Sequence, residues 1–214
     1  MTPNQKTGEF LFRYRDYTPI PIIILAILFA EPSVLSLALG LGVACLGEFV
    51  RTYGVAYIGT ISRTRSYSNG QLVQEGPFGV LRNPLYLGNL LLSVGLAIMS
   101  GVLWLPLVVI VFFYAQYIPI VAWEEMKLIN IFGSVYLEYC NKVPQRWFPK
   151  LSAVLSGDWY VKPSEWAPAL RSERRTLTSV IAFLLVMAAL FYANLNFSDS
   201  PLLPLIHRIP IFAR

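Results

Sequence analysis

Charged residues, cysteine and histidine are all scarce in this sequence. Asp, Glu, Lys and Arg make up only 14% of the 214 residues, whereas hydrophobic residues make up 56%. This balance is too apolar for a soluble domain and indicates a membrane protein. Two cysteines, Cys45 and Cys140, and one histidine, His207, are present. Since they form neither a disulfide framework nor a metal-ligand pattern, we expect no metal site.

We also expect neither a cleavable signal peptide nor a nucleic-acid-binding module. Residues 1–15 are polar, and no small-residue cleavage site follows the first apolar run, so we expect the first span to stay in place. A net charge of +5 can indicate nucleic-acid binding. The basic residues follow the pattern of membrane loops instead, so we expect no nucleic-acid partner.

Five apolar runs predict helices that cross or enter a bilayer. They cover residues 18–30, 34–50, 85–100, 102–122 and 176–195. Short turns join the first four runs into two helical hairpins. We therefore predict an all-α, polytopic membrane helix bundle of about five spans, forming one domain over residues 1–214. Small residues in the second run, Gly40, Ala44 and Gly47, predict that a neighbouring backbone approaches it closely.

Lysine and arginine are concentrated in alternate loops of this scheme. Three precede the first span, four lie in 51–82 and eight lie in 127–175, whereas the two hairpin turns contain none and the C-terminal tail contains two. Loops rich in Lys and Arg usually face the cytoplasm, so we expect the N-terminus inside and the C-terminus on the opposite side. Residues 51–82 are then expected to form a cytoplasmic loop with interfacial pieces.

The segment GPFGVLRNPLYLG, residues 76–88, lies where the third run begins. Pro84 fixes the backbone at the entry to the span, and Asn83 is expected to cap the helix. Arg82 adds a positive charge that can hold a carboxylate. Three glycines, Gly76, Gly79 and Gly88, leave room for a ligand to approach the backbone. The alternative is an ordinary interfacial anchor, with Arg82 extended to the interface and Tyr86 in the aromatic belt.

The segment WEEMKLINIFGSVYLEYCNKVPQRWFP, residues 123–149, follows the fourth run. Glu124 and Glu125 lie directly at the end of a long apolar helix, where a carboxylate is costly unless a cation compensates it. Such a pair favours a cationic ligand. Aromatic and charged residues then alternate on a predicted amphipathic helix and its exit. For Lys127, Glu138 and Lys142 we expect an ordinary solvated position.

Together these two segments resemble the isoprenylcysteine carboxyl methyltransferase family, and more loosely the phospholipid N-methyltransferases. The family pattern is Arg-His-Pro-x-Tyr-x-Gly, a helical hairpin, Glu-Glu, Phe-Gly-x-x-Tyr-x-x-Tyr and an ending similar to Val-x-Arg-x-x-Pro. Its pieces occur here in the same order over residues 76–149, the expected methyltransferase core. The matching residues are Arg82, Asn83, Pro84, Tyr86, Gly88, Glu124, Glu125, Phe132, Gly133, Tyr136, Tyr139, Val143, Arg146 and Pro149.

The resemblance implies an enzyme that uses S-adenosylmethionine, bound in a pocket that the loop after the hairpin caps. No strand-glycine-helix unit of a soluble nucleotide-binding fold is present to bind it otherwise. In this interpretation Glu125 pairs with the ammonium group of the cofactor, and Arg82 meets its carboxylate. Further residues expected at the cofactor are Gly76, Asn83, Pro84, Tyr86, Gly88, Tyr136 and Tyr139.

The implied acceptor is an amphiphilic small molecule or a lipid, lipid-like or prenylated, that enters sideways from the membrane lipids, and carboxylate O-methylation is the favoured reaction. Arg146 is then expected to position the acceptor carboxylate. If the acceptor is an amine, Glu124 or a tyrosine becomes the candidate base, because a proton must be removed. Arg146 and Glu124 are therefore the expected catalytic residues.

The sequence departs from the family pattern in two places. Asn83 stands where eukaryotic and archaeal members have histidine, and asparagine cannot carry a charge. The connection 151–175 and the extra C-terminal span 176–195 lie outside the matched core, so the resemblance assigns them no role.

Two other classes of function stay open. Sterol reductases that use NADPH share an Arg-x-Pro-x-Tyr element, although they have more spans before it than the two predicted here. A non-catalytic membrane scaffold is the second alternative. It predicts that Arg82, Glu125 and Arg146 do not line one pocket together.

Overall fold

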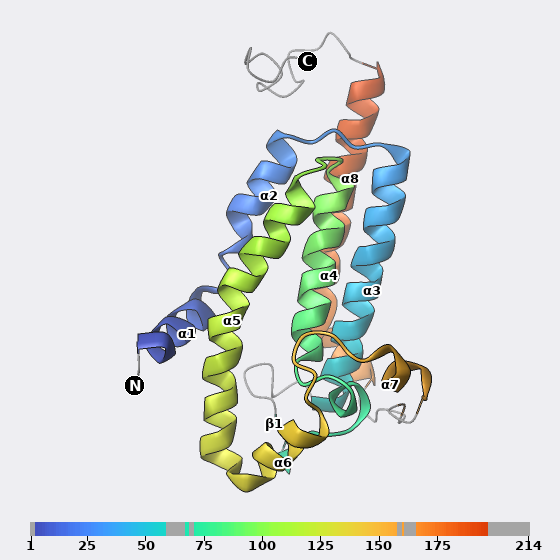
Figure 1. The fold of residues 1–214 in the computed structure, drawn as a ribbon. Helices are drawn as coiled ribbons and strands as arrows, with labels where there is room; N and C mark the ends of the chain where they lie inside the picture. The colour runs from blue at the N-terminus through green and yellow to red at the C-terminus, as the bar shows by residue number, and fades with distance from the viewer. Residues whose placement is uncertain (1–2, 59–66, 69–70, 158–159, 161–165, 197–214) are drawn as a thin grey trace.

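The computed structural model describes residues 3–58, 67–68, 71–157, 160 and 166–196, and its main elements form a bundle of helices (Figure 1). A short antiparallel ladder pairs Tyr67 with Leu72. The predicted all-α fold is confirmed. The elements in chain order are α1 (Pro3–Tyr14), α2 (Pro19–Leu28), α3 (Val34–Ile58), β1 (Tyr67–Ser68), β2 (Gln71–Leu72), the 3-10 helix η2 (Gly76–Gly79), α4 (Pro84–Met99), α5 (Leu105–Phe132), α6 (Ser134–Lys142), α7 (Leu151–Leu155) and α8 (Trp166–Asn196).

Each of the five predicted apolar runs lies in a helix. Among the described residues, three helices are long and apolar enough to cross a membrane: Val34–Ile58, Leu105–Phe132 and Trp166–Leu195. The other two, α2 and α4, have 10 and 16 residues. At a rise of 1.5 Å per residue they measure about 15 and 24 Å, less than the ~30 Å of a hydrocarbon layer. The bundle therefore combines three full-length helices with two shorter apolar ones.

Helix α3 continues well beyond its apolar run and ends at Ile58. The expectation of a loop from residue 51 onward is therefore wrong for 51–58. The continuation is stabilised by packing, because Val55 and Ala56 form a buried cluster with Ala169 of α8. Helix α8 likewise begins at Trp166, in a polar stretch that precedes the predicted span.

Helices α3 and α4 lie against each other through small residues. A Cβ atom added to Gly47 would lie 2.5 Å from the backbone nitrogen of Leu92, and one added to Gly95 would lie 2.5 Å from that of Ala44. Gly40 has a similar contact with Met99. The close approach that Gly40, Ala44 and Gly47 predict is confirmed, and the partner is α4.

The α2–α3 turn and the α4–α5 turn meet at the end of the bundle where α4 ends (Figure 1). The backbone N–H of Glu31 donates a hydrogen bond of 2.8 Å to the carbonyl of Ser100. Gly101 has φ +77°, and a Cβ atom there would lie 1.9 Å from the carbonyl oxygen of Glu31. Only glycine fits this position without strain. The α2–α3 and α4–α5 hairpins are thus joined where their turns touch.

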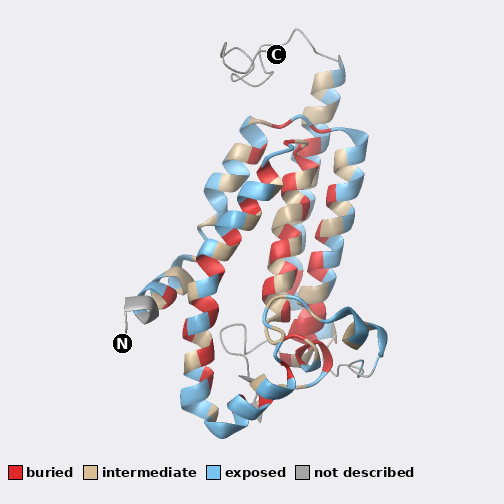
Figure 2. Cartoon of the chain, viewed as in Figure 1, coloured by how far each residue is buried: buried red, intermediate tan, exposed pale blue. Residues whose placement is uncertain are grey.

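Buried residues face the interior of the bundle, and exposed residues cover its outside (Figure 2). The largest buried cluster draws on α2, α3, α4, α5 and α8, with Ala44, Met99 and Leu105 almost wholly enclosed. Large apolar side chains such as Leu39 and Leu185 point outward. Such a surface suits helices that are surrounded by lipid tails.

Substitution Gly47→Leu is expected to lower the free energy of unfolding by about 3 kcal/mol, because α3 and α4 must separate to admit the side chain. Gly42→Leu is the matched control, since a Cβ atom at Gly42 meets no atom within 4 Å. Thermal unfolding in detergent micelles measures both. Equal unfolding temperatures for the two variants would contradict the close α3–α4 contact.

Candidate cofactor and acceptor site

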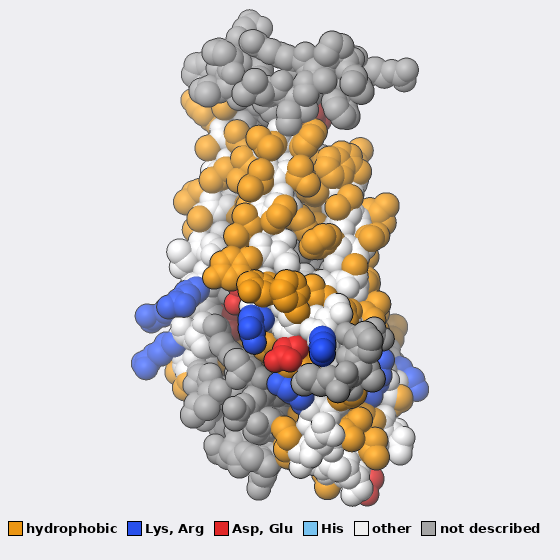
Figure 3. Space-filling model, turned by 90° about the vertical axis from the view of Figure 1, so that its left-hand side faces the viewer, with side chains coloured by type: hydrophobic (Ala, Val, Ile, Leu, Met, Phe, Trp, Pro, Cys, Tyr) orange, Lys and Arg blue, Asp and Glu red, His pale blue; other side chains and the backbone are white. Residues whose placement is uncertain are grey.

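The candidate site lies at the end of the bundle where α4 begins, which we call the site end. The 3-10 helix η2, the last turns of α5, helix α6 and residues 143–149 converge there. Figure 3 shows Lys, Arg, Asp and Glu side chains gathered in the lower half of the molecule, below a surface of mainly hydrophobic side chains. The site end is therefore the charged end of an otherwise apolar bundle.

The carboxylate of Glu125 lies between two guanidinium groups. Its Oε2 accepts a 2.7 Å hydrogen bond from Arg146, and its Oε1 lies 3.5 Å from Arg82. The Glu125 and Arg82 side chains are each only 11% exposed, whereas that of Arg146 is 46% exposed. The two predicted segments thus meet at one carboxylate, and one of its two cations is accessible.

The neighbouring Glu124 has a different environment. Its Oε2 accepts a 2.6 Å hydrogen bond from the hydroxyl of Tyr86. The Tyr86 ring is buried and packs against the ring of Tyr117, with the centroids 4.7 Å apart. Glu124 and Glu125 are adjacent in sequence, but one carboxylate bonds a neutral phenol and the other bonds cations.

Backbone hydrogen bonds fix the start of α4 against the chain that follows α6. The Arg82 N–H donates to the carbonyl of Gln145 at 2.9 Å, and the Arg82 guanidinium donates to the carbonyl of Pro144 at 3.3 Å. The amide Nδ2 of Asn83 donates to the carbonyl of Arg146 at 3.2 Å. The predicted helix cap by the Asn83 side chain is wrong, because its amide binds Arg146 and makes no capping bond.

Two tyrosines of α6, Tyr136 and Tyr139, are buried at the site end. The hydroxyl of Tyr139 donates a 2.8 Å hydrogen bond to the carbonyl of Phe78 in η2. Burial raises the pKa of both phenols, and for Tyr136 the negative charge of Glu125 raises the pKa further. Both therefore stay protonated at any physiological pH, so they act as hydrogen-bond donors and do not accept protons.

The glycines and the proline of the first segment have structural neighbours. A Cβ atom on Gly88 would lie 2.8 Å from the carbonyl of Gly47, so this glycine serves the α3–α4 contact. Gly76 has φ +59° and lies against the ring of Tyr57. Pro84 is the buried first residue of α4. Packing and backbone conformation explain all three positions.

Comparison with known proteins finds methyltransferases with similar sequences. A family model described as phospholipid methyltransferase matches residues 35–135. A protein-S-isoprenylcysteine O-methyltransferase B of Arabidopsis thaliana is 33% identical over 112 residues, which are 49% of this chain and 55% of that protein. Over about half of its length the chain is similar to phospholipid and isoprenylcysteine methyltransferases.

Two further relatives of this chain have other names. The cobalt-zinc-cadmium resistance protein CzcN of Cupriavidus metallidurans is 31% identical over 116 residues, 54% of this chain and 50% of that protein. A Delta(14)-sterol reductase of Mus musculus is 31% identical over 80 residues, 37% of this chain and 19% of the reductase. The chain spans about half the length of the first two relatives. No solved structure matches it significantly.

A second buried polar cluster was not predicted, and it links the C-terminal helix to this methyltransferase-like core. Arg51 of α3 forms a 2.8 Å ion pair with Glu173 of α8, and it also donates a hydrogen bond to Asn89 of α4. Asn89 in turn donates to the hydroxyl of Tyr117 on α5 at 3.3 Å. A signal was available in the sequence, because Glu48 interrupts an apolar run and charges inside spans seldom lack a partner. Glu48 lies 3.6 Å from Arg51.

Substitution Glu173→Ala is expected to lower the free energy of unfolding by about 3 kcal/mol, because it removes one partner of a buried ion pair. The neighbouring exposed Arg174→Ala is the control and should change stability little. Thermal unfolding in detergent micelles measures the difference. If both variants unfold like the parent protein, Glu173 does not anchor α8.

Proposed function

We propose that this protein is a methyltransferase that uses S-adenosylmethionine to methylate a lipid-like acceptor at the site end, with carboxylate O-methylation favoured. The observation that carries the proposal is the Glu125 carboxylate between Arg82 and Arg146. The relatives favour methyl transfer as the reaction at this arrangement, since isoprenylcysteine O-methyltransferases are among them. The positive-inside pattern of the loops supports a cytoplasmic site end, where a soluble cofactor is available.

The residues at the site end fit the amino-acid part of S-adenosylmethionine. Oε1 of Glu125 and Nε of Arg82 are both buried and make no hydrogen bond. A buried polar atom without a hydrogen bond is costly. Oε1 of Glu125 therefore favours a ligand group that donates a hydrogen bond, and Nε of Arg82 favours one that accepts a hydrogen bond. Glu125 would hold the ammonium group and Arg82 the carboxylate, and the loosely paired 3.5 Å contact between them would give way. When bound, the cofactor supplies a methyl group on a positively charged sulfur.

Arg146 is the proposed acceptor-orienting residue, because it is the more exposed cation at Glu125. An acceptor carboxylate bound there places an oxygen toward the methyl carbon. When bound, S-adenosylmethionine would supply a methyl group whose transfer to the acceptor oxygen would break the carbon–sulfur bond, so a negative acceptor and a positive sulfonium would give a neutral ester and a neutral thioether. No proton moves, so no general base is needed. Orientation and exclusion of water are what the protein contributes.

Phospholipid N-methylation is the second candidate, and the pair of Tyr86 with Glu124 favours it. An amine acceptor releases a proton, and the half-buried Glu124 carboxylate, which is paired with neither Arg82 nor Arg146 in the contacts described, is the candidate to accept it. The matched family model carries the phospholipid methyltransferase description. A reductase that uses NADPH is the third candidate, and it rests on the sterol reductase relative.

Substitution Glu125→Gln is expected to weaken S-adenosylmethionine binding by at least about tenfold, because it removes a charge-assisted hydrogen bond to the ammonium group. Calorimetric titration of the purified protein measures this affinity. The exposed Glu138→Gln on α6 is the matched control. Binding of NADPH in place of S-adenosylmethionine by the parent protein would move the proposal to the reductase.

Substitution Arg146→Ala is expected to lower turnover by about 100-fold and to change the affinity for S-adenosylmethionine far less, because the acceptor loses its orienting cation. Turnover is the transfer of a labelled methyl group from S-adenosylmethionine to a host lipid extract, and the labelled product identifies the acceptor. Lys142→Ala, an exposed cation on α6, is the control. Full turnover in Arg146→Ala would remove Arg146 from the mechanism.

A further inference from the structure

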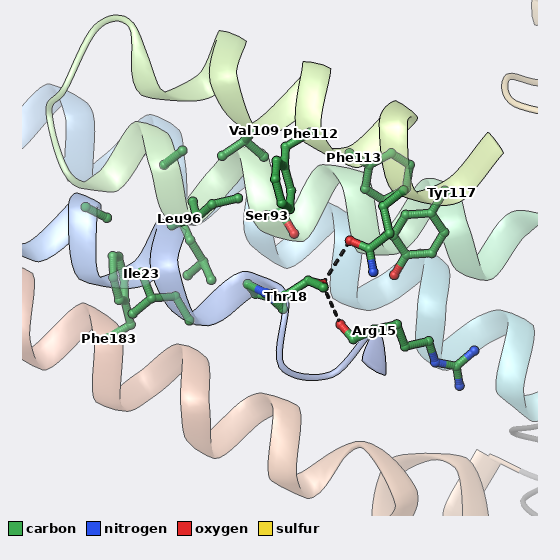
Figure 4. Close-up of a pocket in the computed structure, with 15 residues that line it drawn as sticks. Arg15, Thr18, Ile23, Ser93, Leu96, Val109, Phe112, Phe113, Tyr117 and Phe183 are labelled. Atoms are coloured by element: carbon green, nitrogen blue, oxygen red, sulfur yellow. Dashed lines mark hydrogen bonds between the residues drawn. The ribbon is translucent and has the colours of Figure 1, made fainter. Parts of the chain in front are cut away.

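A pocket lies between α2, α4, α5 and α8 (Figure 4), and its empty space, including the part that is open solvent, is about 640 Å³. Its walls are mostly hydrophobic and include Leu96 of α4, Phe113 of α5 and Phe183 of α8. Two lining residues, Ile23 and Phe112, are also exposed on the outer surface of the bundle. An apolar pocket that opens on a lipid-facing surface suits a hydrocarbon chain.

One wall of the pocket carries a polar group without a sufficient partner. Gln116 of α5 lines the pocket and is only 7% exposed. Its Oε1 lies 2.8 Å from the hydroxyl of Thr18, and its Nε2 makes no hydrogen bond. The Thr18 hydroxyl also lies 2.8 Å from the carbonyl of Arg15, although it has one hydrogen to donate. If the amide is turned round, Nε2 donates one hydrogen to Thr18 and still has a second. A donor is therefore left over in either orientation.

The unpaired N–H of Gln116 restricts the chemical class of the ligand more than the apolar walls do. A plain hydrocarbon would bury the amide N–H without an acceptor, which is unfavourable. A chain that is attached through an ester or amide carbonyl brings an acceptor to the same place. The pocket therefore favours a carbonyl-linked chain over an ether- or thioether-linked one.

The pocket also adjoins the candidate site. Tyr117 lines the pocket, and its ring packs on Tyr86, whose hydroxyl binds Glu124. Gln116 precedes Glu124 by eight residues on α5, a rise of about 12 Å along the helix axis. A lipid with its chain in the pocket and its carbonyl at Gln116 thus has its polar head directed toward the site end.

We propose that this pocket holds the hydrocarbon chain of the methyl acceptor, and that Gln116 binds an ester or amide carbonyl at the head of that chain. The inference rests on the proposed methyltransferase function, because it takes the site end as the place of reaction. It adds a role for α8, which lies outside the matched residues 35–135 and contributes Phe183 to the wall.

Lipid retention tests the pocket without any reaction. The full-length protein is reconstituted in vesicles that contain equal amounts of diacyl phosphatidylserine and its dialkyl ether counterpart, then extracted, and the retained lipid is quantified by mass spectrometry. The parent protein should retain the diacyl lipid about tenfold over the ether lipid, which corresponds to one hydrogen bond to the amide. Gln116→Leu should abolish this preference, because the donor is gone. Ala97→Phe, which fills the pocket from α4, should reduce retention of both lipids.

Leu107→Phe is the matched control, since Leu107 lies on the outer surface of α5 and does not line the pocket. In the methyl-transfer assay, Ala97→Phe should raise the lipid concentration at half-maximal rate about tenfold and leave S-adenosylmethionine affinity unchanged. Equal retention of the two lipids by the parent protein, or an unchanged half-maximal concentration in folded Ala97→Phe, would overturn the assignment. Gln116→Leu decides the case if Ala97→Phe does not fold. Retention ratios do not depend on methyl transfer, so failure of the methyltransferase proposal alone would leave them as expected.

Discussion

The carboxylate of Glu125 holds together two stretches of chain that lie far apart in the sequence. It is nearly buried, so it is stable only because Arg82 and Arg146 compensate its charge. One of these cations precedes α4, and the other follows α6. The last turns of α5 are thereby fixed to both, and the backbone bonds of residues 82–83 with 144–146 complete the junction. Without this carboxylate, two guanidinium groups would face each other across the site.

The position of α4 depends on a second constraint, its backbone contact with α3. Gly88 and Gly95 of α4 lie against Gly47 and Ala44 of α3, so the two helix axes approach more closely than larger side chains allow. Since α4 starts at Pro84, this contact sets where Arg82 and Tyr86 lie relative to α5. The small residues that pack the bundle and the charged residues at its end thus belong to one arrangement.

The sequence predicted the structure correctly where a residue pattern is compatible with few structures. Apolar runs predicted five apolar helices, of which three among the described residues are long enough to cross a membrane, and small residues predicted the α3–α4 contact. The order of the Arg82 and Glu125 segments predicted that both belong to one site, and the structure brings them together. The expected Asn83 cap failed because a nearby carbonyl, that of Arg146, competes for the same amide, and such a partner 63 residues away is invisible in local sequence.

Contacts between residues far apart in the sequence also explain the other differences between prediction and structure. Helix α3 continues to Ile58 because α8 covers it, and the contact of Ala56 with Ala169 has no local signature. The Arg51–Glu173 pair likewise joins residues more than a hundred positions apart. Gly88 fits both a ligand approach and a helix contact by its lack of a side chain, so only the neighbouring backbone of Gly47 distinguishes the two explanations.

The junction of the two hairpin turns has a mechanical consequence for entry from the bilayer. Glu31 and Ser100 are joined by a backbone hydrogen bond, and Gly101 lies so close to Glu31 that no side chain fits between the two turns. Helix α2 is therefore tethered at its C-terminal end. At its N-terminal end Thr18 shares a side-chain hydrogen bond with Gln116 of α5, and α1, which precedes it in the chain, packs on α5 through the rings of Phe12 and Trp123. Both ends of α2 are thus attached to the rest of the bundle, so a chain that enters the pocket from the bilayer would pass between the ends of α2, beside the outward-facing lining residues Ile23 and Phe112.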